Sequence, residues 1–134
     1  MRRLPILCLD FDGVLYSYGS GWLGADVLPD PPTEGAMSFL GEAVEVFHVH
    51  VYSTRSHQTG GVDAMRNWLI HYLVDHYGQS SGWDIVNQIN FPTYKPPARV
   101  GLDDRQLTFE GDWPNMETLL NFKPYYRREA NETN

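Results

Sequence analysis

The chain has a single cysteine, Cys8, among its 134 residues. One cysteine excludes an internal disulfide framework and a cysteine-rich zinc site. Positive charge is also scarce, because ten Lys and Arg residues stand against seventeen Asp and Glu residues, for a net charge of -7. Such a chain lacks the broad positive surface that binds nucleic-acid backbone. General nucleic-acid binding is therefore disfavoured, and only a local basic groove is left open.

Long apolar runs are missing as well. The N-terminal apolar run ends at Asp10 after a few residues, which is too short for the hydrophobic segment of a secretory signal. No stretch approaches the ~18 apolar residues that a membrane-spanning helix needs. We therefore expect a soluble, cytoplasmic domain that makes no membrane contact.

What is present fits one folded domain. Hydrophobic residues make up 42% and charged residues 20% of the chain, which is ordinary for a globular protein and excludes general disorder. A chain of this length can bury one core but not two. We predict a single domain over residues 1–126 and a polar tail over residues 127–134.

The order of the expected elements indicates an α/β domain. Apolar runs predict short strands at residues 4–9, 46–52, 85–91, 99–102 and 106–109. The first of these is continuously apolar, as in a strand that is covered on both faces. Apolar residues at helical spacing predict helices that cover residues 36–47, with Thr33 as N-cap, 62–76 and 114–122. Alternating strands and helices predict a mostly parallel central sheet. Residues 13–32, rich in Gly, Tyr, Ser and Pro, predict an irregular flap with a small hairpin.

Polar side chains follow several of the predicted strands. In parallel sheets, ligands bind beyond the carboxyl ends of the strands. Four carboxylates and one lysine would meet there, and so many like charges cannot all stay ionised without a cation. With no His or Cys at these positions, a hard, oxygen-seeking ion such as Mg²⁺ fits better than zinc. The residues concerned are Asp10, Asp12, Ser53, Thr54, Lys95, Asp103 and Asp104.

Together these segments resemble the four motifs of the haloacid dehalogenase (HAD) superfamily of phosphohydrolases, in the right order. The first motif is matched by Asp10-Phe11-Asp12-Gly13-Val14-Leu15 after an apolar strand. The second is matched by Val49-His50-Val51-Tyr52-Ser53, with Thr54 as the alternative end, and the third by Lys95-Pro96. The fourth is matched by Val100-Gly101-Leu102-Asp103-Asp104. The resemblance spans about residues 5 to 113 and implies a three-layer Rossmann-like domain.

The resemblance also implies a mechanism and a cofactor. Asp10 would be the nucleophile that forms an aspartyl-phosphate, and Asp12 the general acid and base. Mg²⁺ would be held by Asp10, by the backbone carbonyl of Asp12 and by Asp103, with Asp104 as a further ligand or a partner of one. Lys95 would neutralise charge on Asp10 and on the phosphoryl group.

The remaining candidates would contact the substrate. Ser53 would donate a hydrogen bond to a phosphoryl oxygen, with Thr54 as its rival for that role. Gly13 and Arg55 complete the set of candidate substrate-binding residues.

The expected flap is too short to be one of the large cap domains inserted in many members of the superfamily. The chain therefore resembles a small capless member, with an open site suited to a phosphorylated small molecule or a phosphorylated macromolecule end. The flap carries Tyr16, Tyr18 and Trp22, which either stack on a nucleotide base or pack the flap onto the body. A homo-oligomer that covers the site is also left open.

Two other functions are weighed against a phosphatase. The first is a catalytically weak HAD-like module that binds a phosphorylated ligand or a protein partner. The second is a phosphoacceptor receiver domain, which uses a similar set of residues. In receiver domains the acidic pair comes early, whereas here Asp103 and Asp104 follow Ser53 and Lys95, so the order of the motifs argues against it.

Overall fold

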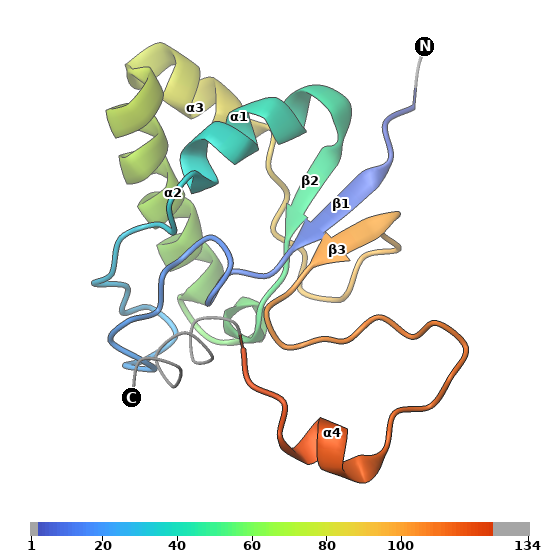
Figure 1. Cartoon of the computed structure of the whole chain (residues 1–134). Coiled ribbons are helices and arrows are strands. Elements are labelled where there is room, and N and C mark those ends of the chain that lie inside the picture. Colours follow the sequence, from blue (N-terminus) through green and yellow to red (C-terminus); the bar gives the residue numbers. More distant parts are fainter. Residues whose placement is uncertain (1–2, 125–134) are drawn as a thin grey trace.

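A computed structural model describes residues 3–124 of the chain (Figure 1). Three strands form a parallel sheet in the order β2-β1-β3, where β1 is Ile6–Leu9, β2 is His48–Val51 and β3 is Val100–Leu102. The helices are α1 (Ala36–Val46), α2 (Gly61–Tyr77), α3 (Gln79–Asn87) and the short α4 (Met116–Leu120), with a 3-10 turn, η1 (Thr54–His57), soon after β2. The predicted α/β class and parallel sheet are confirmed. Within the described range no helix is both long and apolar enough to span a membrane.

One face of the sheet carries the core. Leu7, Leu9, Val49 and Val51 alternate with more exposed residues along β1 and β2, which is the pattern of strands with one covered face. These four side chains share a single apolar cluster with residues of α1, α2 and α3. Figure 1 shows the three helices grouped on one side of the molecule, with β3 on the other. On the second face of β1, Cys8 is only half-buried, so the full cover predicted for this strand is not seen.

The strand predicted at residues 85–91 is wrong. Helix α3 extends to Asn87, and beyond it only Asn90 pairs beside β2, through an isolated bridge to His50. Ile85 and Val86 of α3 are both buried, and Ile89 just beyond the helix is buried in the same core. Short apolar runs of this kind suit either a strand or a buried helix, and here packing against α2 decides in favour of the helix.

The C-terminal elements also differ from expectation. Residues 106–109 form no strand, and the helix predicted over residues 114–122 is limited to α4. The apolar side chains of α4 are exposed, so this helix has no core contact to lengthen it. The polar tail predicted over residues 127–134 lies outside the described residues.

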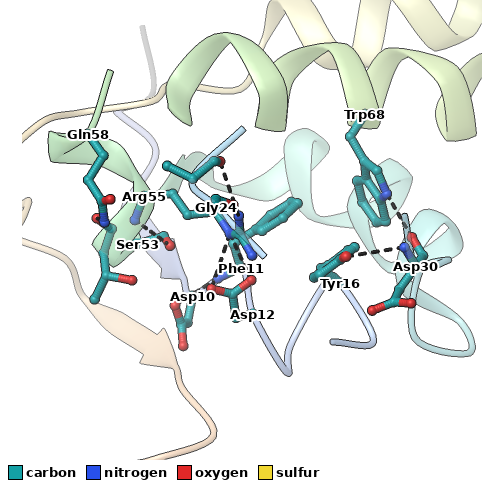
Figure 2. Close-up of polar contacts among 12 residues, drawn as sticks. Asp10, Phe11, Asp12, Tyr16, Gly24, Asp30, Ser53, Arg55, Gln58 and Trp68 are labelled. Carbon is teal, nitrogen blue, oxygen red and sulfur yellow. Dashed lines mark hydrogen bonds and ion pairs between the residues drawn. The ribbon is translucent and has the colours of Figure 1, made fainter. Parts of the chain in front are cut away.

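The flap, residues 13–32, is irregular as predicted but contains no hairpin strands. It is fixed to the body through Tyr16, which is fully buried and stacks on Phe11 with ring centroids 5.3 Å apart. The Tyr16 hydroxyl accepts a hydrogen bond from the Asp30 backbone N–H at 3.1 Å, and Trp68 Nε1 of α2 donates to the Asp30 carbonyl at 3.0 Å (Figure 2). Aromatic packing therefore holds both ends of the flap against α2.

Thr33 is not the N-cap of α1. The helix begins after Gly35, whose φ of 83° is a left-handed conformation that favours glycine. The Thr33 hydroxyl instead donates to the backbone carbonyl of Val14 at 2.6 Å. Thr33 thus joins the two ends of the flap.

Candidate functional site

The parallel sheet brings the ends of β1 and β3 together. Asp10 directly follows β1, and its backbone N–H donates to the carbonyl of Leu102 at the end of β3, at 3.0 Å. Asp103 and Asp104 come next in the chain, so they lie beside Asp10. On the other side of β1, the N–H of Tyr52 donates to the Leu9 carbonyl at 3.1 Å, which places the Ser53 turn next to the same edge.

Three carboxylates meet at this edge. Asp10, Asp103 and Asp104 each offer one oxygen atom, and these atoms all lie within 4.8 Å of one another. The Asp104 side chain is only 2% exposed, and its Oδ1 atom is buried without a hydrogen-bond partner. The only cation paired with the cluster in the described chain is Arg105, whose exposed side chain approaches Asp104 Oδ2 at 3.9 Å. We call these three residues the acidic cluster.

The electrostatics of the acidic cluster are unfavourable without a cation. Burial, reinforced by the neighbouring charge of Asp103, raises the pKa of Asp10 to about 8. Burial also raises the pKa of Asp104. Oxygen ligands, an unpartnered buried oxygen and uncompensated negative charge all fit a hard divalent cation. The residues present could therefore hold such an ion.

Asp12 is paired with a buried arginine rather than with the acidic cluster. Arg55 Nε donates to both carboxylate oxygens of Asp12, at 2.9 Å to Oδ1 and 3.2 Å to Oδ2 (Figure 2). Burial raises the pKa of Asp12, and the Arg55 guanidinium acts in the opposite direction. The Asp12 side chain remains 17% exposed, so it borders solvent beside Asp10.

Ser53 is used to shape the turn after β2. It is buried, its Oγ accepts a hydrogen bond from the Arg55 backbone N–H at 3.1 Å, and its own N–H donates to Ser56 Oγ at 3.0 Å. This is the capping box of η1, with the acceptor side of the hydroxyl occupied. Thr54, the alternative candidate, is exposed.

Gly13 forms a tight turn after the Asp10–Asp12 segment. It is buried, has a φ of 78°, and donates its N–H to the Tyr16 carbonyl at 2.8 Å. A side chain would be strained in this left-handed conformation. The geometry therefore gives Gly13 a clear role in directing the chain into the flap.

Lys95 does not reach Asp10. Its side chain is exposed, and among the described residues no ion pair or hydrogen bond joins it to any carboxylate. Its charge acts instead on Cys8, where it opposes the raising of the thiol pKa by burial. Of the sequence-predicted site residues, the structure brings Asp10, Asp103 and Asp104 together, places Asp12 and Arg55 beside them, and leaves Lys95 apart.

Sequence reasoning missed how Arg55 is used. It was a candidate for substrate contact, but its side chain is fully buried and paired with Asp12. Its position two residues after Ser53 was visible in the sequence, whereas its burial depends on the flap closing over it. For Tyr16 the sequence left two roles open, stacking on a base or packing the flap onto the body, and the structure shows the packing role.

A scan against protein-family models, a search of curated proteins and a search of solved structures each found no match for this chain. The functional case therefore depends on the geometry of the acidic cluster and of the Asp12–Arg55 pair.

Proposed function

We propose that this protein is a Mg²⁺-dependent phosphomonoesterase that acts through an aspartyl-phosphate intermediate. The observation that supports it best is the acidic cluster, in which Asp10 lies with Asp103 and Asp104 while Asp12 follows two residues later on the same turn. The proposal includes the HAD-like, three-layer Rossmann-like arrangement, of which the parallel β2-β1-β3 sheet would form the centre. Cytoplasmic residence belongs to the same proposal and is compatible with the free thiol of Cys8.

In the first step, an Asp10 carboxylate oxygen attacks the phosphorus atom and the bond from phosphorus to the leaving oxygen breaks. Asp12 gives its proton to that oxygen, so the product leaves as an alcohol. In the second step, water attacks the phosphorus of the aspartyl-phosphate, the bond between phosphorus and the Asp10 oxygen breaks, and Asp12 takes a proton from the water. Inorganic phosphate is released, and both carboxyl groups return to their starting states.

The acidic cluster would hold the metal ion through Asp10, Asp103 and Asp104, with the backbone carbonyl of Asp12 as a further ligand. A bound Mg²⁺ would supply positive charge that stabilises the phosphoryl oxygens and keeps Asp10 ionised at neutral pH. Without it, burial and the neighbouring charge of Asp103 raise the pKa of Asp10 to about 8 and so favour its protonated form. A protonated carboxyl is a poor nucleophile, so the chemistry itself calls for a cation.

The proposed substrate class is based on the shortness of the flap, because no large cap domain is inserted beside the acidic cluster in the described chain. The flap is the excursion between β1 and α1, and its Tyr16 packs against Trp68 of α2 with ring centroids 5.5 Å apart. An open site suits a phosphorylated small molecule or a phosphorylated macromolecule end. The ring of Trp22 remains 45% exposed on the flap, which leaves it able to stack on a base. Nucleotides and nucleic-acid ends are therefore the first substrates to test.

One observation favours a second candidate function, a catalytically weak HAD-like module that binds a phosphorylated ligand or a protein partner. Among the described residues, Lys95 is exposed and makes no ion pair or hydrogen bond with Asp10, so the positive charge expected beside the reacting phosphoryl group is not held there. A site that lacks this charge would bind phosphate but stabilise its transfer less well.

One assay distinguishes the phosphatase from the binding module. Hydrolysis of 4-nitrophenyl phosphate is measured with Mg²⁺ and with EDTA, for the wild type and for Asp10→Asn. The phosphatase proposal predicts metal-dependent turnover that falls by at least roughly a thousandfold in Asp10→Asn. Asp75→Asn, an exposed carboxylate on α2, is the matched control and should keep wild-type activity. Phosphate binding without turnover of aryl phosphates, nucleotides or phosphorylated oligonucleotide ends would support the binding module instead.

A further inference from the structure

Arg55 is the largest fully buried side chain of the described residues. A buried guanidinium is costly unless its charge and its N–H groups are satisfied. Arg55 is satisfied in two directions. Nε donates to the carboxylate of Asp12, and Nη1 donates to the carbonyls of Gly24 at 2.7 Å and Ala25 at 3.1 Å (Figure 2). One side chain thus connects the Asp12 carboxylate with the flap.

The flap also covers the guanidinium with an aromatic ring. The Arg55 Cζ atom lies 4.5 Å from the ring centroid of Trp22 and 5.6 Å from that of Tyr16. Cation–π contact of this kind is strongest when the cation is desolvated. Flap residues 22–25 therefore wrap around Arg55, and they can leave their position only by exposing or unpairing it.

The burial of Arg55 carries a cost in folding stability. Arg55 Nη2 is buried and has no hydrogen-bond partner among the described residues. An unsatisfied buried N–H group costs about 1–3 kcal/mol. An apolar side chain would avoid that cost but would leave the Asp12 carboxylate and the carbonyls of Gly24 and Ala25 without their donor, so Arg55 serves Asp12 and the flap together.

We infer that Arg55 is a positioning residue, which couples the orientation of the Asp12 carboxylate to the closure of flap residues 22–25. The inference depends on the proposed function, because it concerns the residue that would serve as general acid. One N–H group shared between the two oxygens of Asp12 fixes the rotation of the carboxylate, and the flap carbonyls fix the guanidinium. When the flap opens, Asp12 loses its orientation and the leaving oxygen is no longer protonated efficiently.

The experiment compares kcat/KM for two substrates that differ in their leaving groups. The first is 2,4-dinitrophenyl phosphate, whose leaving group departs readily without a proton. The second is glycerol phosphate, whose alkoxide leaving group needs one. Arg55→Met should lower kcat/KM for glycerol phosphate roughly a hundredfold, but that for the dinitrophenyl ester less than about threefold. A role confined to stability would lower both values equally.

Two milder variants keep the test independent of the folding of Arg55→Met. Trp22→Leu removes the covering ring but leaves Arg55 in place, and it should lower the ratio of the glycerol phosphate value to the dinitrophenyl value by roughly fivefold to tenfold. Arg55→Lys keeps the charge but cannot reach Asp12 and the flap carbonyls together, so it should not restore the wild-type ratio. The matched control is Arg66→Met. Arg66 also makes a side-chain hydrogen bond, 2.8 Å to Asn87, and lies over a tryptophan ring, but away from the site.

A combined variant shows whether Arg55 acts through Asp12. In an Asp12→Asn background, Arg55→Met should change the ratio of the two kcat/KM values by less than about twofold, because the group it positions is gone. Equal losses on both substrates in Trp22→Leu and Arg55→Lys would overturn the inference while leaving the phosphatase proposal intact. Absence of metal-dependent turnover in the wild type, on every phosphoester tested, would overturn the proposed function and this inference with it.

Discussion

Replacing Asp10 by asparagine should stabilise the metal-free protein while it removes the nucleophile. Asn keeps an oxygen that can accept the Phe11 N–H hydrogen bond, which Asp10 Oδ1 accepts at 2.8 Å. It removes the charge that burial and Asp103 oppose. The substitution should therefore relieve repulsion in the acidic cluster without changing the turn.

The magnitude follows from the raised pKa of Asp10. An unfolded Asp releases its proton near pH 3.8, whereas folded Asp10 holds its proton up to about pH 8. Between these values the folded state binds more protons, so the free energy of unfolding of the wild type falls as pH rises. Each unit of pKa is worth about 1.4 kcal/mol, and because Asp10 is only partly buried and Asp103 is exposed, water weakens both the burial effect and the repulsion, so we expect about 2 kcal/mol at pH 8.

The assay is thermal unfolding in EDTA across pH 5 to 8. Asp10→Asn should raise Tm by about 6 to 10 °C at pH 8, and by about a third of that at pH 5. Asp75→Asn, which makes the same charge change on the exposed side of α2, should show neither effect. Added Mg²⁺ should raise the Tm of the wild type more than that of Asp10→Asn. An Asp10→Asn protein no more stable than wild type at pH 8, or a difference that did not shrink toward pH 5, would refute the account of the acidic cluster.

Three further predictions concern packing. Gly82→Ala should destabilise by about 1–3 kcal/mol in urea unfolding, because a Cβ there would lie 2.6 Å from the backbone nitrogen of Val74 and force α2 and α3 apart. An unchanged midpoint would show that the two helices can separate freely. Ser53→Ala should cost about 1 kcal/mol by removing the acceptor for the Arg55 N–H in the turn after β2, and wild-type stability would show that water replaces it. Trp113→Ser should change stability by less than about 0.5 kcal/mol, because that side chain is 86% exposed, and a larger loss would reveal a contact absent from the structure.

The acidic cluster was predictable because short, local sequence patterns are enough to place its residues at the ends of strands. Asp10 and the Asp103–Asp104 pair each come directly after a short apolar run, and in a parallel sheet the carboxyl ends of neighbouring strands share an edge. No knowledge of loops or helices was needed. The α/β class followed in the same way, from the alternation of strand and helix patterns.

The remaining features of the fold and the site depend on how the loops run in three dimensions, which no local sequence pattern encodes. Lys95 precedes β3 at the spacing expected of the third motif, yet the segment that carries it leaves the side chain exposed, with no contact to Asp10. The burial of Arg55 depends on how Trp22 and Gly24 close over it. The run around Ile85 satisfied both strand and helix patterns, and only packing against α2 selected the helix. The full HAD-like arrangement and the chemistry remain predictions.

The pairing of β1 with β3 also bears on the order in which this protein folds. Leu7 is in register with Val100, so the second edge of β1 is paired only when a strand far along the chain docks beside it. Closing so long a loop is slow, and it becomes favourable only after the contacts nearer in sequence have formed. The β1–α1–β2 unit can therefore assemble first, before Asp103 and Asp104 are brought beside Asp10. The mutual repulsion of the carboxylates arises only when β3 docks, so a divalent cation should accelerate this last stage of folding.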